Sequence, residues 1–414
     1  MTTITGERVD SESRPQPSPM RHAIPPAPGT GRGTRRRLNH VDAMRPIKQA
    51  GVVTTHALIA FAPAGTAVAV GAGLMLTHMT REAFLFVSAC MLAYSQRDLE
   101  RIEHRSFWSR RLTMVAIPYM CWTLIYFLFF MFTSSSSASL TSDLTHLGYL
   151  TVTGYNQLYF LVVLLEFYAL FPAFFWLLRR TRGHHGALMA ASAVVQAVFV
   201  SLVHWAVLPS LMQGWWATRE ITSYQFYLVA GMVVAYHLED VHRWLCSHAR
   251  SVVGCTLVSA GVAEAWYYLA ADHVVSWLGS ASDPFQPIVI PFNVGAIACL
   301  YLIGVGLAKC RAPWARAAVR SGSDNAYGVY LAQMVFITLL GWWGWRHLNS
   351  VLPWPLVIVL SVAVVFVASM ALTALLARTC LAKALTGRAR VPWRAPRQAQ
   401  PEGTTALTAR AIAS

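Results

Sequence analysis

The sequence contains many apolar segments that, as helices, would be about as long as the hydrocarbon core of a bilayer is thick. A helix rises about 1.5 Å per residue, so about twenty apolar residues cross it. Ten segments reach or approach this length, and we expect each to be a membrane-spanning helix. They are residues 47–76, 82–97, 112–133, 156–178, 186–208, 221–238, 251–271, 286–308, 326–345 and 351–377. Because 56% of the residues are hydrophobic and only 12% are charged, the predicted fold class is an all-α membrane protein.

The positive charges lie where a ten-span topology needs them. With the amino terminus inside, every Lys and Arg except Arg81, Arg219 and Arg346 falls in a cytoplasmic piece. This bias predicts both termini in the cytoplasm of a multi-pass cell-membrane protein. The net charge of +15 therefore requires no nucleic acid partner, although the basic surface would also attract anionic lipid headgroups or a polyanionic cytoplasmic ligand.

The chain is predicted to hold one membrane domain between two basic tails. Residues 1–40 and 381–414 are rich in Pro and Arg and are expected to be disordered. The first tail has no apolar core, so no cleavable signal peptide is predicted. No CxxC or HExxH spacing occurs, so we expect no metal site. Within residues 41–380, Pro63 and Gly65 are expected to break or tilt the long first segment.

The first apolar segment carries Arg45 and His56 at a spacing that places them on one helix face. Eleven residues bring the two side chains to within about 20° of each other, roughly 16 Å apart along the axis. A histidine at this depth can pass a proton in either direction; alternatively, a neighbouring helix satisfies a neutral imidazole. Lys48, three residues after Arg45, adds a second positive charge at the cytoplasmic end of this face, which we call the cationic mouth. Asp42 either holds the Arg45 guanidinium or forms a solvated interfacial pair.

Two other sets of charged residues allow two interpretations each. Glu166 lies deep in the segment 156–178, where a carboxylate must be protonated, paired or facing water. It either acts directly or forms a helix-to-helix hydrogen bond. Arg110 and Arg111 stand at the entry to the segment 112–133. They either bind phosphate groups or only fix the orientation of the segment in the membrane.

Six motifs along the chain resemble, in order, those of the acyltransferase-3 family of integral membrane acyltransferases. The first three are "VDAMRPIKQAGVVTTH", "AFLFVSACML" and "SRRLTMVAIPYMCW". Their matching residues are Asp42, Arg45, His56, Phe86, Ser88, Arg110, Arg111, Pro118 and Tyr119. The others are "LYFLVVLLEFYALFP", "YLVAGMVVAYH" and "SDNAYGVYLAQMVF". The resemblance extends from about residue 40 to residue 380.

The chain also departs from the family pattern. Ala89 stands where glycine is usual, and Met114 where a further Arg is expected. Tyr159 replaces a Trp, and Gln157 and Gln333 stand where the family often has His. These departures leave an inactive or altered relative as an alternative.

The resemblance implies an O-acyltransferase that moves an acyl group, usually acetyl, from acyl-CoA to a hydroxyl of a carbohydrate, glycolipid or secondary metabolite. It implies His56 as the base and Arg45 as the guide for the donor. Lys48, Arg110 and Arg111 are expected to bind the donor. Supporting or acceptor-facing roles are expected for Asp42, Ser88, Tyr119, Gln157, Tyr159 and Glu166. The expected partners are the lipid bilayer, the acyl-CoA co-substrate and the acceptor, with no bound cofactor.

A proton-coupled transporter or a lipid or glycan translocator is the alternative of a different class. Buried Glu166, Glu264 and His56 could form a proton path through ten spans. Transporters often carry broken helices at matching positions of two inverted halves. Only the break near Pro63 is evident and no similarity between halves is seen, so the sequence favours the enzyme. A membrane sensor or scaffold is a third interpretation.

Overall fold

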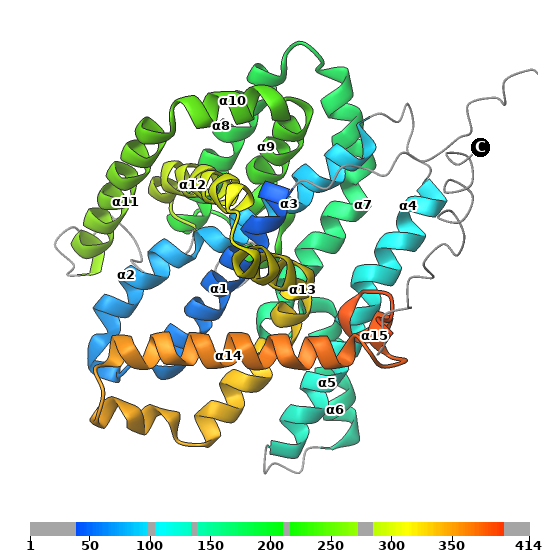
Figure 1. Cartoon of the computed structure of the whole chain (residues 1–414), viewed down its shortest axis with the longest axis vertical. Coiled ribbons are helices and arrows are strands. Elements are labelled where there is room, and N and C mark those ends of the chain that lie inside the picture. Colours follow the sequence, from blue (N-terminus) through cyan, green and yellow to red (C-terminus); the bar gives the residue numbers. More distant parts are fainter. Residues whose placement is uncertain (1–38, 98–103, 134–138, 210–215, 272–284, 393–414) are drawn as a thin grey trace, which may run out of the picture. The chain divides into compact units, whose positions relative to one another are not determined.

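The computed structural model describes residues 39–97, 104–133, 139–209, 216–271 and 285–392, which form helices and no strand (Figure 1). Of the two tails predicted to be disordered, 1–40 and 381–414, residues 1–38 and 393–414 lie outside the described residues, and residues 39–40 belong to the first helix. The helices are α1 (Asn39–Phe61), α2 (Ala67–Thr77), α3 (Met79–Gln96), α4 (His104–Arg111), α5 (Ile117–Thr133), α6 (Leu140–Thr153), α7 (Tyr159–Arg180), α8 (His185–His204), α9 (Gln225–Tyr236), α10 (Leu238–Ser247), α11 (Ala249–Ala271), α12 (Ile290–Lys309), α13 (Pro313–Trp342), α14 (Trp354–Leu376) and α15 (Ala382–Thr386).

Each of the ten predicted spans coincides with helical structure. Six described helices are long and apolar enough to cross a membrane, and the count of ten stays a prediction. They are Arg105–Phe132, Asn156–Arg180, His185–His204, Ala249–Ala271, Pro287–Lys309 and Trp354–Leu376. The expected break in the first segment is confirmed: α1 ends at Phe61 and α2 begins at Ala67, with Pro63 between them. Proline removes a backbone donor and cannot continue the helix ladder.

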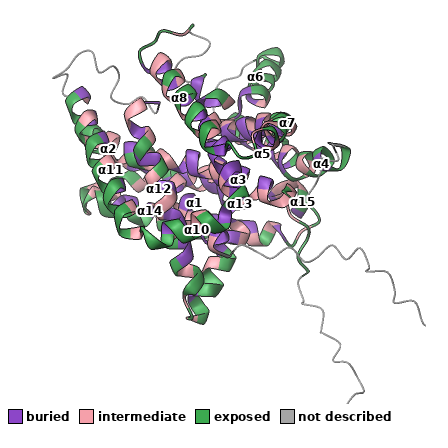
Figure 2. Ribbon diagram, turned by 90° about the horizontal axis from the view of Figure 1, so that it is seen from above, coloured by how far each residue is buried: buried purple, intermediate pink, exposed green. Residues whose placement is uncertain are grey.

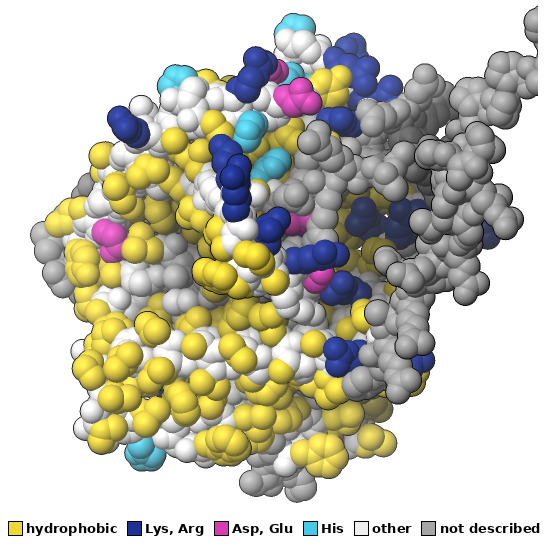
Figure 3. Space-filling model, in the orientation of Figure 1, with side chains coloured by type: hydrophobic (Ala, Val, Ile, Leu, Met, Phe, Trp, Pro, Cys, Tyr) yellow, Lys and Arg dark blue, Asp and Glu magenta, His cyan; other side chains and the backbone are white. Residues whose placement is uncertain are grey.

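Hydrophobic side chains cover a broad area of the surface, whereas Lys and Arg gather toward its upper and right edges in Figure 3. The exposed apolar residues lie on the outer faces of helices, as Leu257 and Val258 do on α11 and Val367 does on α14. Such an apolar surface would aggregate in water but is satisfied by lipid tails. This surface is that of a multi-pass membrane protein.

Helix α1 occupies the interior of the bundle, as Figure 2 shows. It packs against α3, α12, α13 and α14, and Val53, Ala57 and Phe61 are fully buried. Two glycines allow neighbouring helices to approach it closely. A Cβ on Gly304 of α12 would collide with the His40 carbonyl, and one on Gly51 of α1 would lie 2.5 Å from the Thr80 methyl group of α3. The helix that carries Arg45 and His56 is thus held on several sides.

A further close approach joins α3 to α9. A Cβ on Gly231 would collide with the backbone carbonyl of Phe86 and lie 3.2 Å from the Ala89 methyl group. We expect Gly231→Val to lower stability by about 1–3 kcal/mol through overpacking. Thermal unfolding of the purified protein in detergent measures this loss. Gly254→Val on α11, where nothing lies within 4 Å, is the matched control, and equal unfolding temperatures for both variants would contradict the packing argument.

The carboxy-terminal tail begins later than the sequence analysis predicted. Residues 382–386 form α15, and the Trp122 indole Nε1 donates to the Leu385 carbonyl at 2.9 Å. The Val391 amide then donates to the Ala377 carbonyl. Basic composition suggested disorder from residue 381, but an indole donor on another helix supplies a partner that composition does not reveal. The tail is therefore ordered at least to residue 392.

Candidate active site

The first turns of α1 carry the predicted cationic mouth. Arg45 Nη1 lies 3.4 Å from Asp42 Oδ1; the Asp42 side chain is 9% exposed and that of Arg45 is 36% exposed. Of the two interpretations of this pair, the burial of Asp42 favours the one in which it orients the guanidinium. Lys48 is buried, and its Nζ lies 3.3 Å from the centre of the Phe84 ring of α3. A cation over an aromatic face is stabilised by the ring quadrupole.

Arg111 joins this group from α4, whereas Arg110 does not. The Arg111 guanidinium lies 5.3 Å from the centre of the Tyr168 ring, and Tyr168 is also within electrostatic range of Arg45. Arg110 is exposed on the outer face of α4. After Arg111 the helix widens into a π-helical turn, Leu112–Ala116, in which Met114 is exposed. The structure therefore brings Asp42, Arg45, Lys48, Arg111 and Tyr168 together; we call these five residues the cationic cluster.

His56 lies further along α1, on the side that faces the aromatic core. Its neighbours Val53 and Ala57 are fully buried beside α13 residues such as Val329. Val52, one turn before it, packs against the core cluster that includes Phe160 and Tyr330. The His56 imidazole is half-buried and has no hydrogen-bond or ion-pair partner among the described residues. An imidazole that no protein group engages is free to bind a substrate hydroxyl.

Tyrosines occupy the interior between the cationic cluster and the start of α7. Tyr168 lies near Tyr327, and Tyr327 lies near Tyr330. Tyr330 is in turn within range of Tyr159. Buried phenol groups combine an apolar ring with a polar hydroxyl, which suits an interior that must hold both an acyl chain and polar groups. These four residues form a tyrosine series from the cationic cluster into the bundle.

The two glutamines that replace family histidines brace neighbouring helices. Gln157 Nε2 donates to the Tyr126 hydroxyl at 3.0 Å, and the backbone carbonyl of Gln157 accepts from the Tyr330 hydroxyl. Gln49 Nε2 of α1 donates to Gln333 Oε1 of α13 at 3.4 Å. Each amide keeps one buried atom with no hydrogen bond to the part of the chain that the structure describes: Gln157 Oε1 and Gln333 Nε2.

The remaining predicted supporting residues are dispersed. The Tyr119 hydroxyl donates to the carbonyls of Leu150 and Thr151 and so ties α5 to α6. Glu166 Oε2 accepts a hydrogen bond from the amide of Ile221, in the turn before α9, at 3.1 Å. Ser88 is half-buried on α3. The catalytic, donor-binding and acceptor-facing roles of all these residues stay predictions.

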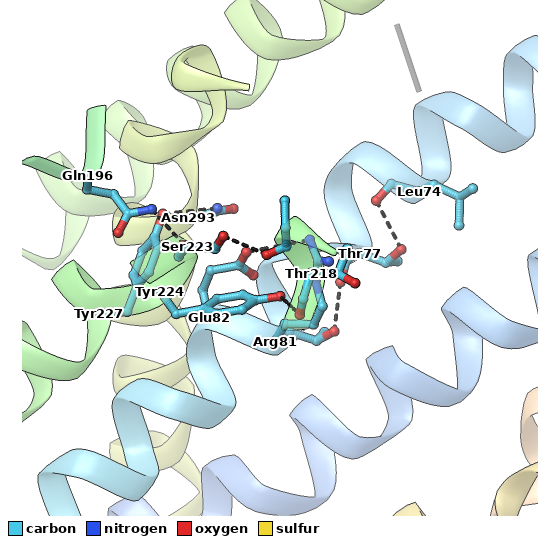
Figure 4. A network of polar contacts seen from close by, with 12 residues as sticks. Leu74, Thr77, Arg81, Glu82, Gln196, Thr218, Ser223, Tyr224, Tyr227 and Asn293 are labelled. Carbon is cyan, nitrogen blue, oxygen red and sulfur yellow. Dashed lines mark hydrogen bonds and ion pairs between the residues drawn. The ribbon is translucent and has the colours of Figure 1, made fainter. Parts of the chain in front are cut away.

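A buried polar network at the start of α3 is not evident from the apolar pattern of the sequence. Arg81 and Glu82 sit inside the bundle among polar groups of α9, α12 and the turns before α9 (Figure 4). The Tyr224 hydroxyl donates to the Thr218 carbonyl at 3.0 Å, and Asn293 Nδ2 donates to the Tyr227 hydroxyl at 3.2 Å. The sequence signal for this network is a pair of adjacent charges, Arg81 and Glu82, at the start of the short apolar segment 82–97. Because α2 is only eleven residues long, the turn after it falls within the bundle.

Comparison with known proteins gives one match. The model of an acyltransferase domain, the acyltransferase-3 family, matches residues 39–373. No curated protein and no solved structure matches the chain. The match extends from the first residue of α1 into α14, so it includes the cationic cluster, His56 and the tyrosine series. The chain therefore belongs to the acyltransferase-3 family and is a membrane acyltransferase.

Proposed function

We propose that this enzyme transfers an acyl group, in the first instance acetyl, from acyl-CoA to a hydroxyl of a carbohydrate, glycolipid or secondary metabolite. The observation that carries the proposal is the arrangement on α1. An oriented, partly exposed guanidinium at one end of a buried helix shares a face with an imidazole that no described protein group engages. The first suits a polyanionic donor, and the second suits a hydroxyl that must lose a proton.

The cationic cluster supports binding of the donor's phosphates. Arg45 and Arg111 both lie near Tyr168 and present planar guanidinium groups, and Asp42 orients the first of them. Arginine matches phosphate oxygens with two parallel N–H donors, which gives both orientation and affinity. Both lie near helix ends that the distribution of basic residues assigns to the cytoplasm, where acyl-CoA is found. The donor's arm then runs along α1 toward His56.

The chemistry requires one base and one leaving group. His56 takes the proton of the acceptor hydroxyl as its oxygen attacks the thioester carbonyl, which forms a C–O bond and a tetrahedral intermediate. Collapse of the intermediate breaks the C–S bond, and the sulfur leaves with the proton that His56 returns. The products are the acyl ester and free CoA thiol. A base positioned in this way contributes about 10²–10⁴-fold to the rate.

The contacts of Glu166 add no support to the transporter alternative. Glu166 is one of the three groups that could form a proton path. Its carboxylate accepts a hydrogen bond from the backbone amide of Ile221. That hydrogen bond gives Glu166 a local role in holding the turn before α9. The family match favours acyl transfer.

Labelled donor tests the proposed function directly. The protein in lipid nanodiscs is incubated with cell extract and acetyl-CoA that carries ¹⁴C on the acetyl group, and in parallel with CoA labelled on the adenine. We expect acetyl label to enter a lipid, glycan or metabolite fraction and adenine label to stay in CoA. Absence of transfer from acetyl-, succinyl- and palmitoyl-CoA by correctly inserted protein would contradict the proposal.

A further inference from the structure

A narrow crevice lies between the ends of α3, α7 and α9 and shares no residue with the cationic cluster or the tyrosine series. Its polar lining consists of Arg97, Arg179, Arg182 and Tyr236. The rest of its lining is apolar and buried, as Phe175 and Met232 are. Its interior holds about 10 Å³, which is room for one water-sized group. Any larger ligand must therefore lie at the mouth of the crevice, where Arg97 and Arg182 are exposed.

An aromatic ring holds each of the three arginines. The stacked pairs, with the distance from the guanidinium carbon to the ring centre, are Arg97–Tyr94 at 4.3 Å, Arg179–Phe175 at 5.9 Å and Arg182–Tyr236 at 5.7 Å. A cation over an aromatic face is stabilised by the ring quadrupole, and the contact restricts a long side chain. The arginines that line this crevice are therefore better ordered than basic side chains that extend freely into solvent.

Two histidines fix the position of Tyr236. The buried His185 ring meets the Tyr236 ring edge to face, with 4.9 Å between their centres. His185 Nε2 lies 2.9 Å from the Leu178 carbonyl, which can only accept, so this nitrogen carries a proton. In neutral His185 the other nitrogen, Nδ1, then accepts a hydrogen bond from His237 Nε2 at 2.8 Å. These contacts join the end of α7, the start of α8 and the end of α9 beside the crevice.

The crevice lies at the level of the lipid headgroups. Arg97, Arg179 and Tyr236 stand at the ends of α3, α7 and α9, which the distribution of basic residues assigns to the cytoplasm. Trp176, next to Phe175 of the crevice, is 65% exposed on the outer face of α7. An exposed tryptophan beside the end of a span is typical of the boundary between membrane and water. The phosphate of a lipid in the cytoplasmic leaflet is thus within reach of the crevice.

We propose that this crevice binds the phosphate group of an anionic phospholipid of the cytoplasmic leaflet. Arginine matches phosphate oxygens with two parallel N–H donors. Three positive charges around one crevice repel one another, and a phosphate at its mouth replaces this repulsion with attraction. The small interior admits one phosphate oxygen. A zwitterionic lipid fits less well, because its cationic headgroup is repelled by the same arginines. The bound lipid then links the ends of α3, α7 and α9 and stabilises the folded protein.

Lipid titration tests the site. The purified protein in detergent is titrated with phosphatidylglycerol, with phosphatidylcholine that has the same acyl chains, and with sodium phosphate. Native mass spectrometry counts bound lipid, and the unfolding temperature is recorded with each ligand. We expect phosphatidylglycerol to bind about tenfold more tightly than phosphatidylcholine, because each arginine near the surface attracts an anionic lipid. It should also raise the unfolding temperature, since a ligand that binds only the folded state stabilises it. Sodium phosphate at the same concentrations should do neither.

Two triple variants separate this site from a general attraction to basic surface. The site variant combines Arg97→Met, Arg179→Met and Arg182→Met. The matched control combines three exposed positions that precede or begin α13: Arg311→Met, Arg316→Met and Arg320→Met. We expect the site variant to lose the preference for phosphatidylglycerol and the control to keep it. Arg182→Met alone, at an exposed position, should weaken phosphatidylglycerol binding by about threefold or more, so the test does not depend on folding of the triple variant.

Three results would contradict the proposal. Equal losses in the two triple variants would show attraction to basic surface in general and overturn the site. Equal affinity of the wild type for the two lipids would also overturn it. Stabilisation by sodium phosphate that phosphatidylglycerol does not match would overturn the assignment of the ligand as a lipid.

Discussion

His56→Ala is expected to lower kcat for acyl transfer by about 10³-fold while leaving the protein inserted and able to bind acetyl-CoA. Removing a general base costs about 10²–10⁴-fold, and no described side chain hydrogen-bonds to His56 and could replace it. The measurement is the initial rate of ¹⁴C-acetyl transfer at saturating donor with nanodisc protein. Donor affinity is measured separately by equilibrium binding of acetyl-CoA.

The control for this variant is His347→Ala, which removes an exposed histidine in the turn before α14. Its kcat should stay within twofold of the wild type, which shows that loss of an imidazole elsewhere is tolerated. An unfolding temperature of His56→Ala close to the wild-type value excludes misfolding as the cause. Transfer by His56→Ala at the wild-type rate would refute the assignment of the base.

Arg45→Met is expected to raise KM for acetyl-CoA by about 10–100-fold and to change kcat less than threefold. Hydrogen bonds to charged groups contribute about 1.5–3 kcal/mol, and each 1.4 kcal/mol is a factor of ten in affinity. Methionine keeps much of the apolar stem and removes the charge. The effect is therefore one of donor binding, measured as KM for each substrate at a fixed concentration of the other.

Arg316→Met, at an exposed position of α13, is the matched control and should leave KM for acetyl-CoA within twofold. High salt should weaken donor binding by the wild type more than by Arg45→Met, because screening removes an interaction that the variant lacks. A variant whose kcat falls while its KM stays unchanged would show that Arg45 acts at the reacting atoms and not at the donor's phosphates.

The parts of the site that depend on local geometry could be predicted from the sequence. The shared face of Arg45 and His56 follows from the helical repeat, and the Asp42–Arg45 contact follows from a spacing of three residues. The break near Pro63 follows from the chemistry of proline. Each of these requires only a few consecutive residues in a helix.

The parts that depend on packing could not be predicted. Hydropathy along the chain places Arg81 and Glu82 at the edge of an apolar segment, but the short α2 places them within the bundle. It likewise gives no partner for Gln333, which meets Gln49 across 284 positions of sequence. It also assigns residues 381–392 to a disordered tail, although α15 docks on Trp122.

The central position of α1 has a consequence for biosynthesis. Helix α1, the first of the described helices, is completed by residues near the end of the membrane domain: Gln49 donates to Gln333, and Arg346 and Asn349 donate to the carbonyls of Ala60 and Phe61. At about 5–20 residues per second, synthesis of the intervening chain takes about 15–60 s. During that interval Gln49 and the last turn of α1 lack the partners that α13 and the turn after it later supply. Helix α1 is therefore fully enclosed only late in translation, and chains cut short before α13 are expected to carry Arg45 and His56 in an incomplete bundle that transfers no acyl group.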